Sequence, residues 1–195
     1  MSRRAQRVQE SAAFLLHATP WRETSLIVQA FSREHGSVAL VAKGAKRPYS
    51  TLRPVLQMFQ PLLLSWSGNG EVKTMTAAEV AGVHPLPGSA MMSAWYMNEL
   101  LLRLLPREDA HPQLFDAYEH ALRSLAAGGW AAGALRRFEW TLLQETGYGL
   151  DRPEPDFADA ASEPALRLLL RERLAELLEG RALATRKVLL ALQRV

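Results

Sequence analysis

The sequence predicts an α+β protein, in which a small five-stranded Greek-key β-barrel precedes an α-helical domain. Two observations lead to this prediction. Before HPLPG at residues 84–88, short apolar runs are separated by turn residues, and after it the apolar residues recur with helical spacing. Because the short runs follow one another without helical crossovers, a closed barrel fits them better than a parallel sheet. We therefore expect a barrel domain at residues 1–84 and a helical domain at residues 85–195.

Five apolar segments of the first domain are predicted strands. They are SAAFLLHA (11–18), SLIVQAFS (25–32), SVALVAKG (37–44), PLLLSWS (61–67) and EVKTMTAAEV (71–80). The sequence SGNG at 67–70 predicts a hairpin turn between the last two strands. Residues 45–60 contain Pro48 and Pro54, so we expect a loop there, with at most a short helix at 52–59.

Four helices are predicted in the second domain. They cover residues 89–105, 111–129 and 130–149, and a segment that begins near Pro164. Apolar stripes on these segments must pack on one another, because no single helix is long enough to be stable alone. Ser162 is the expected N-cap of the fourth helix, after a Pro- and Asp-rich linker at 152–164. Thr185 is the expected cap of a last helix that ends the chain.

Composition excludes several classes of site. The chain has 195 residues and no cysteine, which removes disulfides, thiol catalysis and thiolate zinc sites. Its five histidines show no HxH or HxxxH spacing, so we expect neither a metal nor another cofactor. No nucleotide-binding or nucleophile motif is present, and we expect a protein that is not an enzyme. Without a run of about 20 apolar residues, we expect it to be soluble and cytoplasmic.

Positive charge is concentrated in the first part of the chain. Residues 1–75 hold 10 Lys and Arg against 4 Asp and Glu, whereas residues 76–195 hold 13 against 16. The densest stretch is VAKGAKRPYSTLRP at 41–54, which has four cations and no carboxylate. The proposed DNA-binding set is Arg22, Arg33, Lys43, Lys46, Arg47, Arg53 and Lys73. Lys and Arg bind phosphates with release of counterions, so such a cluster predicts contact with nucleic acid.

Aromatic residues near these cations could stack on bases, as small barrels of this type bind single strands in a groove. The candidates are Tyr49, Trp66 and Trp21, although Trp66 ends an apolar run and is better explained as core. Two alternatives to nucleic-acid binding remain open at this point. The basic stretch could be a solvated loop, or the barrel could be a protein-interaction adaptor without nucleic acid.

A second candidate site surrounds Arg136 in the segment ALRRFEW. An apolar pocket with a cationic rim would suit an acidic peptide that ends in a free carboxylate. The candidate residues are Leu114, Phe115, Tyr118, Leu135, Arg136 and Phe138. The alternative is that the aromatic side chains are core and the arginines are solvated. The residues alone favour this alternative, because amphipathic stripes are usually core.

Four segments carry a resemblance to a known family. PWRETSLIVQAFSREHGSVALVAKGAKR (20–47), LQMFQPLLLSWSGNGEVKT (56–74), MNELLLRLL (97–105) and ALRRFEWTLLQETGYGLD (134–151) resemble the bacterial recombination mediator family RecO. The ending RALATRKVLLALQRV (181–195) is similar to the basic C-terminal helix of that family.

The resemblance implies an N-terminal OB-fold barrel followed by a helical domain, without enzyme activity. It implies binding of single- and double-stranded DNA and annealing of complementary strands, in the bacterial cytoplasm and at the nucleoid. The implied partners are the C-terminal tail of single-stranded DNA-binding protein, RecR, and RecF, which help to load the recombinase RecA at gaps. By the same resemblance, Lys43, Lys46 and Arg47 contact DNA, and Arg136 meets the carboxylate of the tail.

Two departures from the family pattern are visible. Some members carry a four-cysteine zinc module, which this chain lacks. The chain is also shorter than many relatives between Asp151 and Ala165, which leaves the RecR contact an open question.

Overall fold

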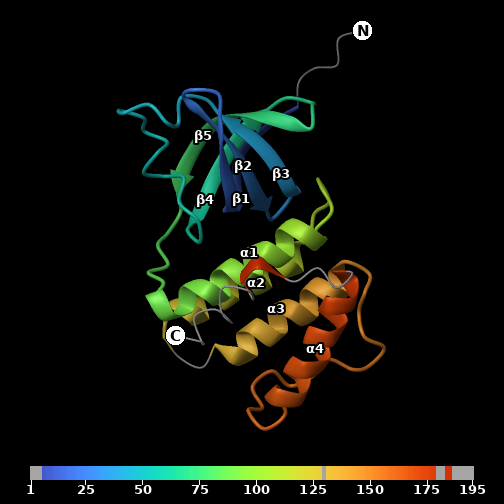
Figure 1. The fold of residues 1–195 in the computed structure, drawn as a ribbon. Helices are drawn as coiled ribbons and strands as arrows, with labels where there is room; N and C mark the ends of the chain where they lie inside the picture. Colours follow the sequence, from blue (N-terminus) through green and yellow to red (C-terminus); the bar gives the residue numbers. More distant parts are fainter. Residues whose placement is uncertain (1–5, 129–130, 179–182, 186–195) are drawn as a thin grey trace. The chain divides into compact units, whose positions relative to one another are not determined.

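The computed structural model describes residues 6–128, 131–178 and 183–185 (Figure 1). The chain forms two compact units. The barrel unit consists of the described residues up to His84 together with Pro106–Pro112. The helical unit consists of Pro85–Leu105 and the described residues from Gln113 onward. The segment Pro106–Pro112, which lies within the predicted helical domain, thus groups with the barrel.

The barrel unit contains five strands that close into a barrel in the order β1-β2-β3-β5-β4 (Figure 1). Their bounds are β1 Arg7–Trp21, β2 Ser25–Ser32, β3 Gly36–Ala42, β4 Pro61–Ser67 and β5 Val72–Val80. Neighbouring strands are antiparallel except β3 and β5, which pair in parallel over three residues of each strand. A closed five-stranded Greek-key barrel is the architecture of the OB fold. The predicted fold class, a β-barrel of this type followed by helices, is confirmed.

Strand β1 is longer than predicted because irregularities let it pair on both sides. Its register with β4 shifts between Val8 and Ser11, and its register with β2 shifts between Leu15 and His17. Glu10, inside the first irregularity, has a positive φ of 51°. Such bulges bend a strand and increase its twist. The bent β1 therefore pairs with β4 in its first half and with β2 in its second half, which closes the barrel.

The barrel interior is filled by alternate side chains of all five strands. Its buried cluster includes Leu15, Val28, Leu40, Leu64 and Trp66. The indole of Trp66 is buried and packs nearly perpendicular to the His35 ring, with 5.2 Å between the ring centroids. The core interpretation of Trp66 is confirmed, so this residue offers no surface to a base.

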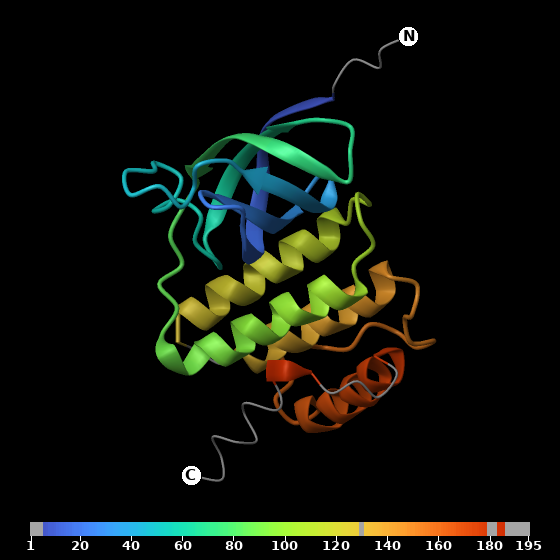
Figure 2. The ribbon, with the colours of Figure 1, turned by 45° about the horizontal axis from the view of Figure 1, so that its top comes forward.

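The helical unit contains α1 Met91–Leu104, α2 Pro112–Ala126, α3 Ala132–Glu145 and α4 Glu163–Leu177, with a short 3-10 turn at Gly88–Ala90 (Figure 2). The predicted stripe of α2 is buried throughout, from Leu114 to Leu125. Helix α4 buries Leu166, Leu170 and Leu174 in the same way, and it packs against α3. These stripes form the core of the unit, as expected for helices too short to be stable alone.

Three local predictions concern residues 52–59, the cap of α4 and the last helix. Residues 52–59 form turns and no helix. Ser162 occupies the N-cap position of α4, but its hydroxyl donates to the carbonyl of Asp159 and makes no cap hydrogen bond. The predicted last helix lies outside the described residues, apart from its first residue, Thr185.

The segment Pro106–Pro112 is fastened to the barrel through its backbone. The Glu108 amide donates to the carbonyl of Ser37 at 3.0 Å, beside a parallel bridge between Ser37 and Arg107. At Gly36, with φ of 65°, an added Cβ would lie only 1.8 Å from the carbonyl oxygen of Asp109. Only glycine permits this approach.

Within the described parts of the chain no helix is long and apolar enough to cross a bilayer.

Candidate nucleic-acid interface

The connection between β3 and β4, residues 43–60, holds four of the predicted cations and projects from the barrel (Figures 1 and 2). It is anchored at both ends. Ala45 is buried in the barrel core, and Leu52, Val55 and Leu56 pack against the same core. The residues between these anchors, from Lys46 to Tyr49, are exposed. The loop therefore presents its polar tip from a fixed base.

A tight turn at the start of the loop sets the direction of the cations. Gly44 has φ of 73°, and its carbonyl accepts a hydrogen bond from the Arg47 amide at 3.0 Å. The Arg47 side chain lies over Gly44, with its Cδ 3.5 Å from where a Cβ would stand. The Lys46 amide donates to the carbonyl of Thr24 at 2.9 Å, which ties the loop to the β1–β2 turn. Arg22 lies in that turn, its guanidinium 5.9 Å from the ring centroid of Trp21.

An open hollow of about 450 Å³ lies at this turn. It is lined by Lys43, Gly44, Arg47, Pro48, Tyr49, Ser50, Thr51 and Leu52. Lys43, Lys46, Arg47 and Arg53 are all exposed, and within the described residues none of them forms a salt bridge. Uncompensated cations beside a hollow create a positive potential that attracts phosphate. We call the residues that line this hollow, with Lys46 and Arg53, the basic loop.

Two residues of the predicted set lie away from the basic loop. Arg33 lies in the β2–β3 turn, half-buried, at the opposite end of β3. The seven residues of β3 separate the two ends by about 20 Å. Lys73 lies in β5 beside Leu40 of β3, and its side chain is only 5% exposed. The structure therefore brings together the four loop cations, with Arg22 on the adjacent turn, and leaves Arg33 and Lys73 apart.

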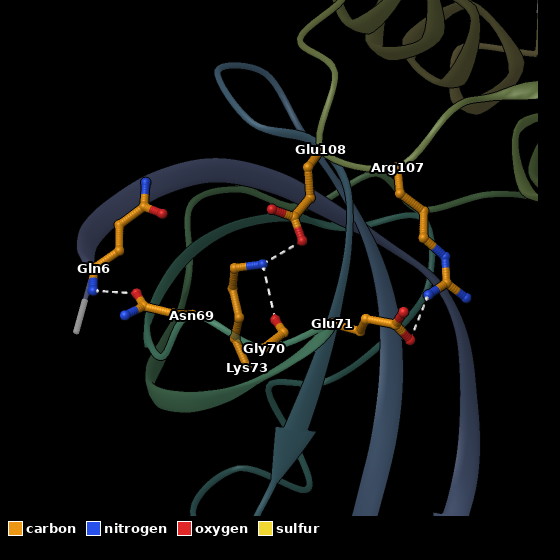
Figure 3. Close-up of polar contacts among 7 residues, drawn as sticks. All are labelled: Gln6, Asn69, Gly70, Glu71, Lys73, Arg107 and Glu108. Carbon is orange, nitrogen blue, oxygen red and sulfur yellow. Dashed lines mark hydrogen bonds and ion pairs between the residues drawn. The ribbon is translucent and has the colours of Figure 1, made fainter. Parts of the chain in front are cut away.

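Lys73 is engaged in an internal ion pair (Figure 3). Its ammonium donates to the Glu108 carboxylate and to the carbonyl of Gly70, at 3.4 Å from the latter. A wider pair between Arg107 and Glu71, at 3.8 Å, joins the same two segments. These contacts hold Pro106–Pro112 against the start of β5. Sequence reasoning missed them, although strict alternation places Lys73 on the same face of β5 as the buried Met75.

The second predicted site lies within the helical unit and is closed. Leu114, Phe115, Tyr118 and Phe138 are buried, and Leu135 is half-buried. Arg136 is 8% exposed and faces two carboxylates. Its guanidinium lies 3.1 Å from an oxygen of Glu139 and 3.9 Å from one of Glu163. The aromatic side chains thus contribute to the core, and Arg136 joins α3 to the first residue of α4.

Glu139 connects this ion pair to α1. The Tyr96 hydroxyl donates to its carboxylate at 2.8 Å. Burial raises the pKa of the Glu139 carboxyl, and the charge of Arg136 and the Tyr96 hydrogen bond oppose that rise. Burial, with the negative charge of Glu139, also raises the pKa of Tyr96 well above its ordinary value. The spacing of Arg136 and Glu139, three residues apart on a helix, is the signal that could have predicted this pair.

No group of three or more His, Asp or Glu side chains in the described ranges is arranged to hold a metal ion. The basic loop presents exposed positive charge, which attracts anions.

Comparison with known proteins agrees with the fold. A family model described as the N terminal of recombination protein O matches residues 7–84, and one described as its C terminal matches residues 88–152. The DNA repair protein RecO of Aromatoleum aromaticum is 60% identical over 146 residues, which cover 74% of this chain and 61% of that protein. The RecO protein of Cupriavidus pinatubonensis is 58% identical over 150 residues, or 76% of this chain and 52% of the relative.

The chain therefore spans between about half and three fifths of the length of these two relatives. A longer match exists in Ralstonia nicotianae, whose DNA repair protein RecO is 44% identical over an alignment that covers 100% of this chain and 88% of the relative. The two family models together match well over half of the sequence. The predicted resemblance is thus confirmed, and the chain belongs to the RecO family, the recombination protein O proteins.

Proposed function

We propose that this protein is a non-enzymatic mediator of DNA repair and recombination whose basic loop binds DNA through its phosphates. The observation that carries the proposal is the set of four exposed cations in one loop, which are free of salt bridges within the described residues. Two of them, Lys43 and Arg47, line the hollow. The names of the relatives, which are DNA repair proteins, support a role in DNA repair. The OB-type barrel favours nucleic acid as the ligand, because such barrels present cationic grooves to nucleic acid.

Binding of this kind accounts for affinity to both single- and double-stranded DNA, since phosphates are common to both. It also offers a route to annealing. Two complementary strands repel each other through their phosphates, and cations placed between them reduce that repulsion. Charge neutralisation on the basic loop would therefore favour pairing of strands. No bond is made or broken in this function, which is why we propose that the protein is not an enzyme.

The proposed partners follow from family membership. They are the C-terminal tail of single-stranded DNA-binding protein, RecR and RecF, with loading of RecA at gaps as the outcome, at the nucleoid in the bacterial cytoplasm. For the tail, binding requires that a peptide carboxylate reach Arg136, which is only 8% exposed. Glu163 is the more distant of the two carboxylates around Arg136, so the carboxylate of a peptide would compete with Glu163 for the guanidinium.

The test of DNA binding is fluorescence anisotropy of labelled single-stranded DNA over a salt series. If the four loop cations contact phosphates, the logarithm of the binding constant should fall with the logarithm of the salt concentration, with a slope of about −3. Affinity that does not change with salt would overturn the proposal and would favour a protein-interaction adaptor.

The same titration with an acidic tail peptide tests the second partner. Glu163→Gln should raise peptide affinity by about threefold if the peptide displaces Glu163 from Arg136. Unchanged peptide affinity would remove Arg136 from the peptide site.

A further inference from the structure

Tyr49 is the feature of the basic loop that phosphate binding does not explain. Its side chain is 98% exposed, at the tip of the loop between Pro48 and Ser50. Large aromatic side chains are mostly buried in folded proteins, because their apolar surface is costly to leave in water. A nearly bare phenol ring contributes little to the stability of the barrel, and both of its faces are open to a ligand.

The loop fixes the backbone that carries this ring. The Ser50 amide donates to the carbonyl of Arg47 at 3.1 Å, which closes a turn around Pro48 and Tyr49. Pro48 fixes its own φ and limits the backbone on the N-terminal side of the tyrosine. The ring therefore has little backbone freedom to lose when a ligand binds, which lowers the entropic cost of binding.

Tyr49 lines the same hollow as Lys43 and Arg47. The open hollow, of about 450 Å³, thus has one aromatic residue and two cations among the residues that line it. A nucleotide has the matching pair of features, a flat base with a π-face and a phosphate. Base stacking on aromatic side chains is a general mode of single-strand binding, because every base has such a face.

We propose that this hollow is a subsite for one unpaired nucleotide of single-stranded DNA, with the base stacked on Tyr49 and the phosphate bound by Lys43 and Arg47. The inference deepens the proposed function and rests on it. In a duplex both faces of an internal base are covered by its neighbours, so the ring has no base to stack on. Tyr49 therefore gives the basic loop a preference for unpaired DNA, which phosphate contacts alone do not provide.

The experiment compares three labelled probes of equal length by anisotropy. They are a single-stranded oligothymidine, a single strand of abasic sugar-phosphate units, and a blunt duplex. Tyr49→Ala should lower affinity for the oligothymidine by about tenfold, the effect expected for one lost stacking contact. It should leave affinity for the abasic strand and the duplex unchanged, and it should leave the salt slope unchanged because no phosphate contact is lost.

Two further variants make the result specific. Tyr49→Phe keeps the ring and should bind like the wild type. Tyr148→Ala removes another exposed tyrosine, in the helical unit, and should change none of the three affinities. Because Tyr49 is exposed, its replacement should not alter thermal unfolding, which confirms that the variant is folded.

The outcomes separate this inference from the proposed function. Equal loss of affinity for the oligothymidine and the abasic strand would overturn stacking, as would no loss for either. In both cases a Lys43→Glu and Arg47→Glu variant that binds all three probes weakly would still support the basic loop as a phosphate site. If the wild type binds none of the probes, the subsite and the proposed function are both wrong.

Discussion

The cations of the basic loop and the two buried cations, Lys73 and Arg136, form an instructive comparison. All belong to the residue types that the sequence suggested for binding of anions. The loop cations are exposed and have no salt bridge within the described residues, whereas Lys73 and Arg136 are buried against Glu108 and Glu139. A buried charge is costly unless it is paired, so a buried cation already has its anion. What a cation can bind therefore depends on its neighbours more than on its type.

The largest effect is expected for Arg136→Ala. The substitution would leave the Glu139 carboxylate buried without its cation, and we expect a loss of about 3 kcal/mol in the free energy of unfolding. Urea denaturation measures it. Because burial raises the pKa of Glu139 in the folded state, the folded protein holds that proton more tightly than the unfolded chain. Stability of the variant should fall as pH rises above the ordinary carboxyl value, so its deficit should be larger at pH 8 than at pH 5.

A loss below about 1 kcal/mol for Arg136→Ala would show that the ion pair is not a buried contact of the helical unit. Arg137→Ala is the matched control, because Arg137 is exposed on the same helix, its guanidinium 5.3 Å from the Phe157 ring centroid.

The next largest effect is expected for the exposed cations of the basic loop. The double variant Lys43→Glu and Arg47→Glu should weaken binding of single-stranded DNA on the order of 100-fold and flatten its salt dependence, since two phosphate contacts become repulsive. Anisotropy over a salt series measures both quantities. The control is Arg123→Glu with Arg152→Glu, which reverses two exposed arginines of the helical unit and should leave DNA affinity nearly intact. Equal weakening by both variants would mean that only total charge matters.

Lys73→Met tests whether a buried cation of the barrel contributes to DNA binding. We expect unchanged DNA affinity and a loss of about 2 kcal/mol in stability, because the substitution removes the ion pair between the buried Lys73 and Glu108 that fastens Pro106–Pro112. The loss stays moderate since Glu108 is half-exposed and can be solvated. A fall in DNA affinity comparable to that of the loop variant would place Lys73 in the DNA path after all.

The smallest effect is expected for Glu99 of α1. Its carboxylate accepts hydrogen bonds from the Ala184 amide at 2.8 Å and from the Thr185 amide at 3.0 Å. Burial acts to raise the pKa of Glu99, but these hydrogen bonds, the Thr185 hydroxyl and the charge of Arg103 lower it overall. A lowered pKa stabilises the folded state above the ordinary carboxyl value, and that contribution is lost as pH falls through the folded value.

Glu99→Gln should therefore cost about 1 kcal/mol near pH 7, and the difference from the wild type should shrink in acid. Denaturation at pH 7 and pH 3.5 measures it. A gap that grows in acid would contradict the assignment, because the protonated carboxyl would then stabilise the folded state more than the carboxylate does.

Much of this fold could be predicted because its signals are local. Turn residues bound β2 and β4, whose observed limits are the predicted ones. The length of β1 could not be predicted, because irregularities at Glu10 and near Leu16 extend its pairing without a mark in the apolar pattern. The parallel pairing of β3 with β5 is also invisible to strand periodicity.

The candidate site likewise has features that local sequence signals predict and features that they do not. Exposure of the basic loop follows from its prolines and its lack of apolar runs, and the structure places the four cations of this stretch in one exposed loop. The partner of Arg136 three residues along its helix could have been read from the sequence, whereas Glu163, on α4, could not. Glu108 likewise reaches Lys73 from 35 residues away along the chain. Long-range pairing decides which cations remain available, and spacing does not reveal it.

Because Glu108 pairs with Lys73, a fragment that contains only the strands would differ from the barrel of the intact chain. A fragment that stops at His84 would contain every strand, yet it would lack the acidic partner of Lys73 and the backbone that covers Gly36. An isolated barrel would thus leave Lys73 without the carboxylate that pairs with it and would expose a cation that is buried in the intact chain. Measurements on such a fragment would overstate its charge, and an exchange of modules between relatives would need to carry residues 106–112 along with the strands.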